Sequence, residues 1–177
     1  MVQNQWRARP NGGPLDAALA SWLCETGSLT ARCQRNSQEF RVRLLRYEKG
    51  QALADEGLRP NRSRHPAWVR EVALECDGVP VIFAHTTLST ASKGRLSRWL
   101  ARLGSNSLGS LLFTHPGFRR GNIEFRRLDK RHPLFRRAAD LGATGDTLWA
   151  RRSLHRLGAQ QVLVTEVFLP ALVFLHA

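Results

Sequence analysis

Two charged side chains fall in stretches whose pattern is otherwise that of buried strands. The first is Glu166, in the apolar, β-branched run 161–170. Because alternate side chains of an extended chain point to opposite faces, Glu166 shares its face with Val162, Val164 and Phe168. We expect its carboxylate to be at least partly buried, and a buried carboxylate needs a charged or hydrogen-bonding partner.

The second charged side chain is Arg70, in the alternating run 67–76. The residues that share its face are Trp68, Val72, Leu74 and Cys76. Glu71 and Glu75 fall on the other face of the same run. A guanidinium on an apolar face needs an anion or carbonyl groups for its fork of N–H donors.

Spacing alone leaves two interpretations of this pair open. Arg70 and Glu166 could form a buried ion pair, or a different register could turn them outward. Alternatively they mark a dry pocket, in which Arg70 binds a carboxylate with two parallel hydrogen bonds. Glu166 would then transfer a proton or accept a hydrogen bond from a hydroxyl group.

The strands that must position these residues are predicted from alternating or apolar runs. They cover residues 40–44, 67–76, 79–84, 122–128, 147–156 and 161–170. Asp77-Gly78 joins the second and third runs and is a strong β-hairpin signal. Gly158-Ala159 joins the last two runs, so a second hairpin carries Glu166.

Apolar residues at helical spacing predict helices between these strands. One opens at Pro14 and ends at Gly27, and a second, capped by Ser28, carries Leu29 and Cys33. A third spans 89–104. The apolar stripes are Leu15, Ala18, Leu19, Trp22 and Leu23 in the first helix and Leu96, Trp99, Leu100 and Leu103 in the third. Lys93, Arg95, Arg98 and Arg102 form a solvated face of the third helix.

The remaining segments are predicted as connections. Residues 51–66 are interpreted as a surface loop, 105–110 as a glycine-containing turn, and 130–140 as a loop or a short helix. The fold class is therefore α+β, with an antiparallel sheet of about five or six strands and helices covering one face. We expect an N-terminal extension at 1–14 and one catalytic domain at 15–177.

Composition narrows the function classes. The 27 Lys and Arg residues against 14 Asp and Glu give a net charge of +13, which favours anionic partners. The arginines are scattered and no nucleic-acid-binding motif accompanies them, which disfavours nucleic acid. The alternatives are a solvated surface with an arginine-rich composition or a small anionic substrate attracted by the positive field.

Other site classes lack their signatures. The three cysteines, odd in number and without CxxC spacing, predict a reduced, cytoplasmic protein. The six histidines lack metal-site spacing, and Walker and GxGxxG loops are absent, so no metal or nucleotide cofactor is expected. No apolar stretch reaches the roughly 18 residues of a membrane span.

Several segments together resemble the bacterial chorismate pyruvate-lyases, in order and in spacing. They are residues 68–74, 76–80, 103–104, 108–113 and 163–171, supported by 27–30 and 148–153. The resemblance extends from Leu15 to Ala171; the first dozen residues and the arginine-rich region 119–140 depart from the family pattern. It implies a monomeric, cofactor-free α+β enzyme that converts chorismate to 4-hydroxybenzoate and pyruvate for ubiquinone biosynthesis.

The resemblance also implies roles for individual residues. The arginine matching Arg70 binds the carboxylate of the enclosed aromatic product, and the glutamate matching Glu166 binds its 4-hydroxyl group. Leu29, where the family often has Met, and Leu108-Gly109, which contributes through its backbone, complete the binding site. Arg70 and Glu166 are accordingly the catalytic candidates, and strong inhibition by an enclosed, slowly released product is expected.

The sequence leaves three points open. Glu166 is either a base or only a hydroxyl acceptor, with the proton then moving within the substrate. The second carboxylate of chorismate could be bound by Arg120, Arg151 or Arg152, although each is also explained as a structural or solvent-facing residue. The alternative function is a non-catalytic small-molecule sensor, because effector domains of some transcription regulators resemble the lyase fold.

Overall fold

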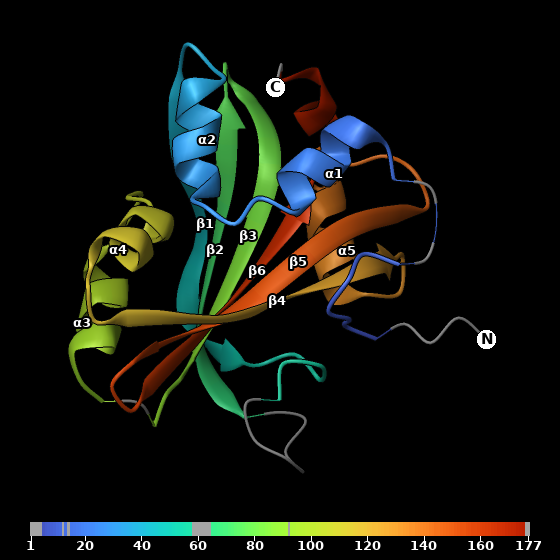
Figure 1. Cartoon of the computed structure of the whole chain (residues 1–177). Coiled ribbons are helices and arrows are strands. Elements are labelled where there is room, and N and C mark those ends of the chain that lie inside the picture. Colours follow the sequence, from blue (N-terminus) through green and yellow to red (C-terminus); the bar gives the residue numbers. More distant parts are fainter. Residues whose placement is uncertain (1–4, 12, 14, 58–64, 92, 176–177) are drawn as a thin grey trace.

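The computed structural model describes all residues except 1–4, 12, 14, 58–64, 92 and 176–177, and it contains one six-stranded antiparallel sheet (Figure 1). The strands are β1 (Phe40–Gln51), β2 (Pro66–Cys76), β3 (Val79–Ser89), β4 (Phe118–Asp129), β5 (Thr147–Leu157) and β6 (Gln160–Phe168). The helices are α1 (Ala17–Leu23), α2 (Leu29–Arg35), α3 (Arg95–Arg102), α4 (Leu108–Thr114) and α5 (Pro133–Ala139), followed by the 3-10 helix η1 (Pro170–Phe174).

The strand order β1-β2-β3-β6-β5-β4 places the last strand of the sequence in the middle of the sheet. After β3 the chain crosses through α3 and α4 to the far edge of the sheet, and β4, β5 and β6 then return strand by strand. The last strand, β6, therefore pairs with β3 in the middle of the sheet.

Both predicted hairpins are confirmed. Asp77 and Gly78 have φ values of 51° and 80°, as a two-residue turn between twisted antiparallel strands requires. At the second hairpin, Leu157 pairs with Gln160 across the turn at Gly158-Ala159. The sheet of six strands also agrees with the predicted fold class.

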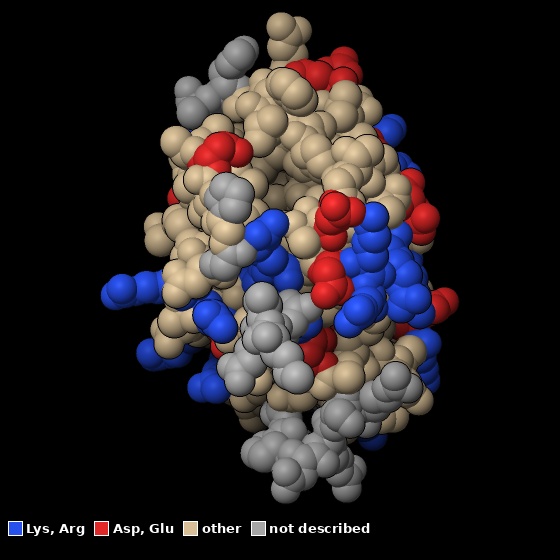
Figure 2. Space-filling model, turned by 90° about the vertical axis from the view of Figure 1, so that its right-hand side faces the viewer, with Lys and Arg blue, Asp and Glu red and all other residues tan. Residues whose placement is uncertain are grey.

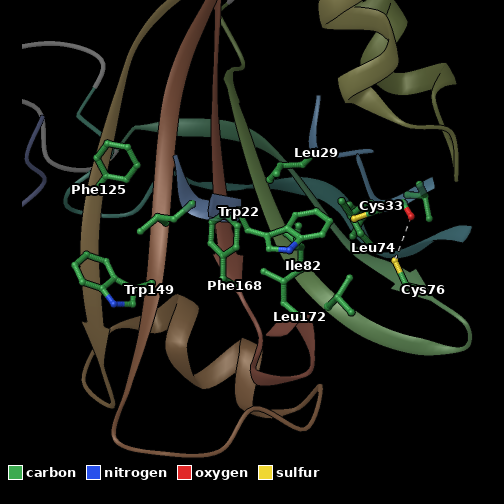
Figure 3. Packing of buried hydrophobic residues seen from close by; sticks show 14 residues of the cluster. Trp22, Leu29, Cys33, Leu74, Cys76, Ile82, Phe125, Trp149, Phe168 and Leu172 are labelled. Carbon is green, nitrogen blue, oxygen red and sulfur yellow. Dashed lines mark hydrogen bonds between the residues drawn. The ribbon is translucent and has the colours of Figure 1, made fainter. Parts of the chain in front are cut away.

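Four helices and η1 cover one face of the sheet. Trp22 of α1 and Leu29 of α2 belong to one core cluster on this face, and Figure 3 shows Trp22 beside Ile82 and Phe168 of the sheet. A second cluster packs α3 and α4 on the same face. Helix α5 lies on the opposite face, where Leu134 and Phe135 pack with Phe83.

Three predicted helix boundaries are corrected. The first helix begins after its N-cap Asp16 and ends at Leu23 rather than at Gly27; Pro14 lies outside the described residues. The third begins only at Arg95, because Ser89 is still paired in β3 and the N-cap residue of the helix is Gly94. The cationic side chains predicted to be solvated, Lys93, Arg95, Arg98 and Arg102, are exposed.

The prediction of a turn at 105–110 is wrong for the second half of this segment, which begins helix α4. Ser107 caps α4, and its side chain accepts a hydrogen bond from the Ser110 backbone at 3.2 Å. Gly109 therefore lies in the first turn of a helix, where capping and the burial of Leu108 and Leu112 outweigh the poor helix propensity of glycine.

The loop predicted at 51–66 is not merely a surface segment. Glu56 is buried, and its Oε1 lies 3.2 Å from Nε2 of His85 on the sheet. His85 Nδ1 lies 2.7 Å from Oε1 of Glu71. Burial alone would lower the pKa of His85, but these two carboxylates outweigh it and raise that pKa. The loop is thus fastened to the face opposite helices α1–α4.

The N-terminal segment also contacts the sheet. Arg7 exchanges backbone hydrogen bonds with Phe125 of β4. Residues ahead of the predicted domain boundary therefore contact the sheet. Within the described residues, no helix is long and apolar enough to cross a membrane.

Candidate active site

A mostly enclosed cavity lies between the centre of the sheet and helices α2 and α4. It is lined by the five residues that were expected to form a site, Leu29, Arg70, Leu108, Gly109 and Glu166, and by others that include Thr86, Arg120, Ser153, His155 and Val164. The cavity volume is about 50 Å³. The cavity is therefore small and lies beneath helices α2 and α4.

Arg70 is almost completely buried, with 2% of its surface exposed. Its Nη2 donates to the carbonyl oxygens of Gly104 at 2.9 Å and Asn106 at 2.8 Å. Among the described residues it has no carboxylate partner, and its Nε has no hydrogen-bond acceptor. Burial lowers the Arg70 pKa to about 10, so the side chain remains a cation at neutral pH. A buried cation with an unused donor is suited to bind an incoming carboxylate.

Glu166 has a different charged partner from Arg70. Its Oε2 accepts a hydrogen bond from Nε of Arg151 at 2.6 Å. Arg151 is 1% exposed, and its Nη1 donates to the carbonyl groups of Leu23 and Glu25 in the segment between α1 and α2. The alternative of a direct Arg70–Glu166 ion pair is therefore wrong. The Glu166 side chain is 18% exposed.

The sheet register separates Arg70 from Glu166 by a space suited to a small ring. Arg70 pairs with Thr86 on β3, and Thr86 pairs with Val164 on β6, two residues before Glu166. Two strand spacings give roughly 9–10 Å across the sheet, and two residues give roughly 6–7 Å along it. The side chains project from the same face, so a ligand between them can contact one at each end.

Helices α2 and α4 form the cavity wall opposite the sheet. Ser28 caps α2 and Ser107 caps α4, and the Oγ atoms of Thr30 and Ser107 lie 2.8 Å apart, which joins the two helix starts. A Cβ atom at Gly109 would lie 3.1 Å from Thr30 Oγ1. The absence of a side chain at Gly109 therefore permits the close approach of the two helices.

Four cavity residues were not assigned a definite place by the sequence analysis. Ser153 Oγ lies 3.0 Å from His155 Nε2, and Arg120 Nε donates to the same Oγ at 3.1 Å. Thr86 lies in the row between Arg70 and Val164. The hairpin register could have identified Ser153 and His155, because alternation from Arg151 places both on the face of Glu166. Arg120 could not be placed this way, since β4 has an irregular register between Arg120 and Ile123.

Of the three arginines considered for a second carboxylate, two are excluded by their contacts. Arg152 projects to the opposite face, where it pairs with Glu124 at 2.7 Å and donates to the Asp55 carbonyl. Arg151 is already engaged by Glu166 and by backbone carbonyls. Arg120 alone of the three lines the cavity.

A wider depression elsewhere, of about 800 Å³, lies between β4, α5 and the segment that follows β1. It is lined by neither Arg70 nor Glu166, and Asp55 there is already bonded to Arg126 and His132. The smaller cavity is the better candidate because it contains the unpaired buried cation. The described residues contain no group of three or more His, Cys, Asp or Glu side chains arranged to hold a metal.

Known proteins resemble this chain over almost its whole length. The family model described as Chorismate lyase matches residues 3–177. A probable chorismate pyruvate-lyase from Dechloromonas aromatica is 70% identical over 175 residues, covering 99% of each chain. A protein of the same name from Methylobacillus flagellatus is 43% identical over 172 residues, 96% of this chain and 95% of that one.

Among solved structures, the effector domain of PhnF from Mycobacterium smegmatis has a TM-score of 0.53 at 18% identity, covering 82% of this chain and 90% of that one. The ligand-binding domain of a GntR-family regulator from Bordetella bronchiseptica has a TM-score of 0.50 at 16% identity, covering 76% and 86%. At these identities the likeness concerns the fold alone.

Proposed function

The chain belongs to the chorismate lyase family, and we propose that the cavity between the sheet and helices α2 and α4 is the active site of a chorismate pyruvate-lyase. This enzyme converts chorismate into 4-hydroxybenzoate and pyruvate. The observation that carries the placement of the site is the buried Arg70, which has no carboxylate partner among the described residues and shares its cavity with Glu166.

In this proposal the ring of the substrate lies between Arg70 and Glu166. Arg70 binds the ring carboxylate, which supplies the anion that its unused donor lacks. The Glu166 carboxylate accepts a hydrogen bond from the hydroxyl group at the para position. Leu29 contacts the ring, Leu108 contributes through its backbone, and the small Gly109 lets the start of α4 lie close to the ligand.

The reaction breaks the bond between ring C3 and the ether oxygen of the enolpyruvyl group and removes the hydrogen from C4. The ring becomes aromatic, and the enolpyruvyl methylene gains a proton as pyruvate forms. All atoms of chorismate appear in the two products, so no cofactor is required. The protein mainly positions the substrate and excludes water, and such positioning contributes up to roughly 7–11 kcal/mol.

Two routes for the C4 hydrogen fit this arrangement, and Glu166→Gln separates them. If Glu166 is the base, the variant loses turnover by a factor of roughly 100 or more while it still binds 4-hydroxybenzoate. If the hydrogen passes directly to the enolpyruvyl group, turnover falls only as far as hydroxyl binding weakens. Melting curves of the variant must accompany the assay, because Arg151 loses its anionic partner.

Turnover of chorismate is the direct test of the function. Purified protein mixed with chorismate should release 4-hydroxybenzoate and pyruvate in equal amounts, measured by chromatography and a coupled pyruvate assay. Binding of either aromatic acid without product formation would instead support a non-catalytic sensor.

The cellular setting is part of the same proposal. A 4-hydroxybenzoate product suits the synthesis of ubiquinone, and a monomer in the cytoplasm is expected to supply it. The proposed catalytic domain spans 15–177, preceded by the extension 1–14. These assignments rest on the family membership and on the absence of any need for a partner in the reaction.

A further inference from the structure

Two arginines line the cavity without an ion-pair partner among the described residues, Arg70 and Arg120. The nearby carboxylates are already paired, Glu166 with Arg151 at 2.6 Å and Glu25 with Arg32 at 3.4 Å. The cavity therefore has an excess of two positive charges. Chorismate carries two carboxylates, whereas 4-hydroxybenzoate carries one.

Arg120 is held in place by neutral groups rather than by a carboxylate. Its Nε donates to Ser153 Oγ at 3.1 Å, and its Nη1 donates to the Thr26 carbonyl at 2.9 Å. The guanidinium carbon also lies 5.5 Å from the centre of the Phe113 ring. These contacts fix the orientation of the guanidinium but leave its full charge and several N–H donors for a ligand.

Ser153 connects Arg120 to a buried histidine. Because Ser153 Oγ accepts a hydrogen bond from Arg120, its own proton is available for His155 Nε2, which lies 3.0 Å away. His155 then carries its proton on Nδ1, and this atom has no partner among the described residues although the side chain is only 4% exposed. His155 Nδ1 is thus a further unused donor, on a residue that lines the cavity together with Arg120.

The sheet register places Arg120 in one row with His155 and Val162, four residues along β6 from Glu166, and its side chain lines the same cavity. From β2 to β4, Arg70 comes first, Glu166 follows on β6, and Arg120 lies beyond it on the edge strand. Glu166 and Arg151 are close enough to act electrostatically on Arg120. In chorismate the enolpyruvyl ether is attached at C3, next to the C4 hydroxyl group that Glu166 is proposed to bind.

We propose that Arg120 binds the enolpyruvyl carboxylate of chorismate, with Ser153 and His155 as positioning residues on the same side of the cavity. The inference rests on the proposed function for its substrate. In this inference Arg120 distinguishes the substrate from the product, because it contributes to the binding of chorismate but not to that of 4-hydroxybenzoate. Cleavage of the ether therefore removes one of the two charge contacts that retain the ring in the cavity.

The test compares Arg120→Leu and Arg120→Gln with Arg119→Leu. Arg119 is the exposed neighbour on β4, so its replacement removes the same charge outside the cavity. We expect kcat/KM for chorismate to fall at least about 30-fold in both Arg120 variants, as for loss of a buried charge contact. The Kd for 4-hydroxybenzoate, measured by calorimetry, should change less than about threefold. Arg119→Leu should behave like the wild type.

Equal losses for chorismate and 4-hydroxybenzoate, or wild-type kcat/KM in a folded Arg120 variant, would overturn the inference. The 4-hydroxybenzoate titration also shows whether each variant retains a folded cavity. Ser153→Ala and His155→Leu should shift chorismate KM in the same direction by a smaller factor, again with little change in 4-hydroxybenzoate Kd.

The proposed function can fail separately from this inference. Absence of turnover in the wild type would reject the lyase function, and calorimetry with intact chorismate would then replace the kinetic assay. A ratio of chorismate to 4-hydroxybenzoate affinity that falls in Arg120→Leu but not in Arg119→Leu would still support the assignment of Arg120. An unchanged ratio, or no binding of chorismate, would reject it.

Discussion

At the scale of single residues, the cavity separates cations that are already neutralised from cations that are not. Arg151 and Glu166 form a pair, and removal of either would leave the other buried and uncompensated. Arg70 is satisfied by two carbonyl groups only, which do not neutralise its charge. This difference, rather than burial itself, is why we propose Arg70 as a binding residue and Arg151 as a structural one.

The first prediction concerns Arg70. We expect Arg70→Ala to weaken 4-hydroxybenzoate binding by about 2–5 kcal/mol, because the ring carboxylate loses its charged partner. Arg70→Lys should recover only part of this loss, since an ammonium group cannot form two parallel bonds. Calorimetric titration measures both. Arg98→Ala, an exposed arginine on α3, is the control, and wild-type affinity in folded Arg70→Ala would contradict the role.

The second prediction concerns pH and His155. Burial, with repulsion from Arg120 and Arg151, lowers the His155 pKa to about 4, although Glu166 acts in the opposite direction. Between pH 6.5 and 4 the unfolded chain therefore binds a proton that the folded protein does not. The corresponding stability is complete above about pH 6.5 and is lost as pH falls toward 4.

Replacing His155 removes this dependence. The free energy of unfolding of His155→Leu should depend less steeply on pH between 4 and 6.5, by up to about 1.4 kcal/mol per pH unit. Denaturant titrations of wild type and variant across this range measure the difference. Identical slopes in the two proteins would contradict a neutral, buried His155.

At the scale of elements, helices α2 and α4 form the cavity wall opposite the sheet. The two helices are short, at 7 residues each, and their starts are joined by the Thr30–Ser107 hydrogen bond. The rest of the cavity is formed by central strands of the sheet, which cannot separate without breaking ladder hydrogen bonds. Movement of the helical wall is therefore the least costly route for ligand exchange.

The third prediction concerns release of the product past helices α2 and α4. Release of 4-hydroxybenzoate should limit turnover, so rapid mixing with chorismate should show a burst of product and added 4-hydroxybenzoate should inhibit. Thr30→Val removes the bond between the helices and should speed product dissociation several-fold. Thr114→Ala removes a bond within α4 only and serves as the control. A linear time course without a burst would place the slow step elsewhere.

At the scale of the whole molecule, the feature that bears on ligand binding is the net charge of +13. On the face shown in Figure 2, groups of Lys and Arg side chains alternate with Asp and Glu rather than forming one continuous stripe. This distribution, with the net charge of +13, suits attraction of a small dianion more than the tracking of a nucleic-acid backbone. We accordingly expect no steeply salt-dependent binding to duplex or single-stranded nucleic acid.

The fourth prediction concerns the effect of the net positive charge on the capture of the substrate. If the net positive charge steers chorismate toward the cavity, kcat/KM should decrease as the KCl concentration rises from about 10 to 150 mM, as the Debye length shortens from roughly 30 to 8 Å. The kcat value should change little. A kcat/KM value independent of salt would indicate that the surface charge has no part in substrate capture.

The sequence by itself determined what local geometry controls. The two-residue turns at Asp77-Gly78 and Gly158-Ala159 set where their hairpins reverse, although the register of β2 with β3 shifts once between Leu74 and Glu75. Alternation within β2 and β6 places Arg70 and Glu166 on apolar faces. These features depend on residues close together in the chain. The family resemblance added the enzyme class, which the Chorismate lyase match across residues 3–177 supports.

Only the tertiary structure decided which of these faces meet. The pairing of β3 with β6 joins Thr86 to Val164, far apart in the sequence, and no local pattern specifies that contact. It brings Arg70 and Glu166 into one cavity, and the packing of helices α1–α4 decides which sheet face is covered. The irregular register of β4 likewise hid the position of Arg120. Alternation identifies the side chains that share a face, whereas long-range packing decides what that face encloses.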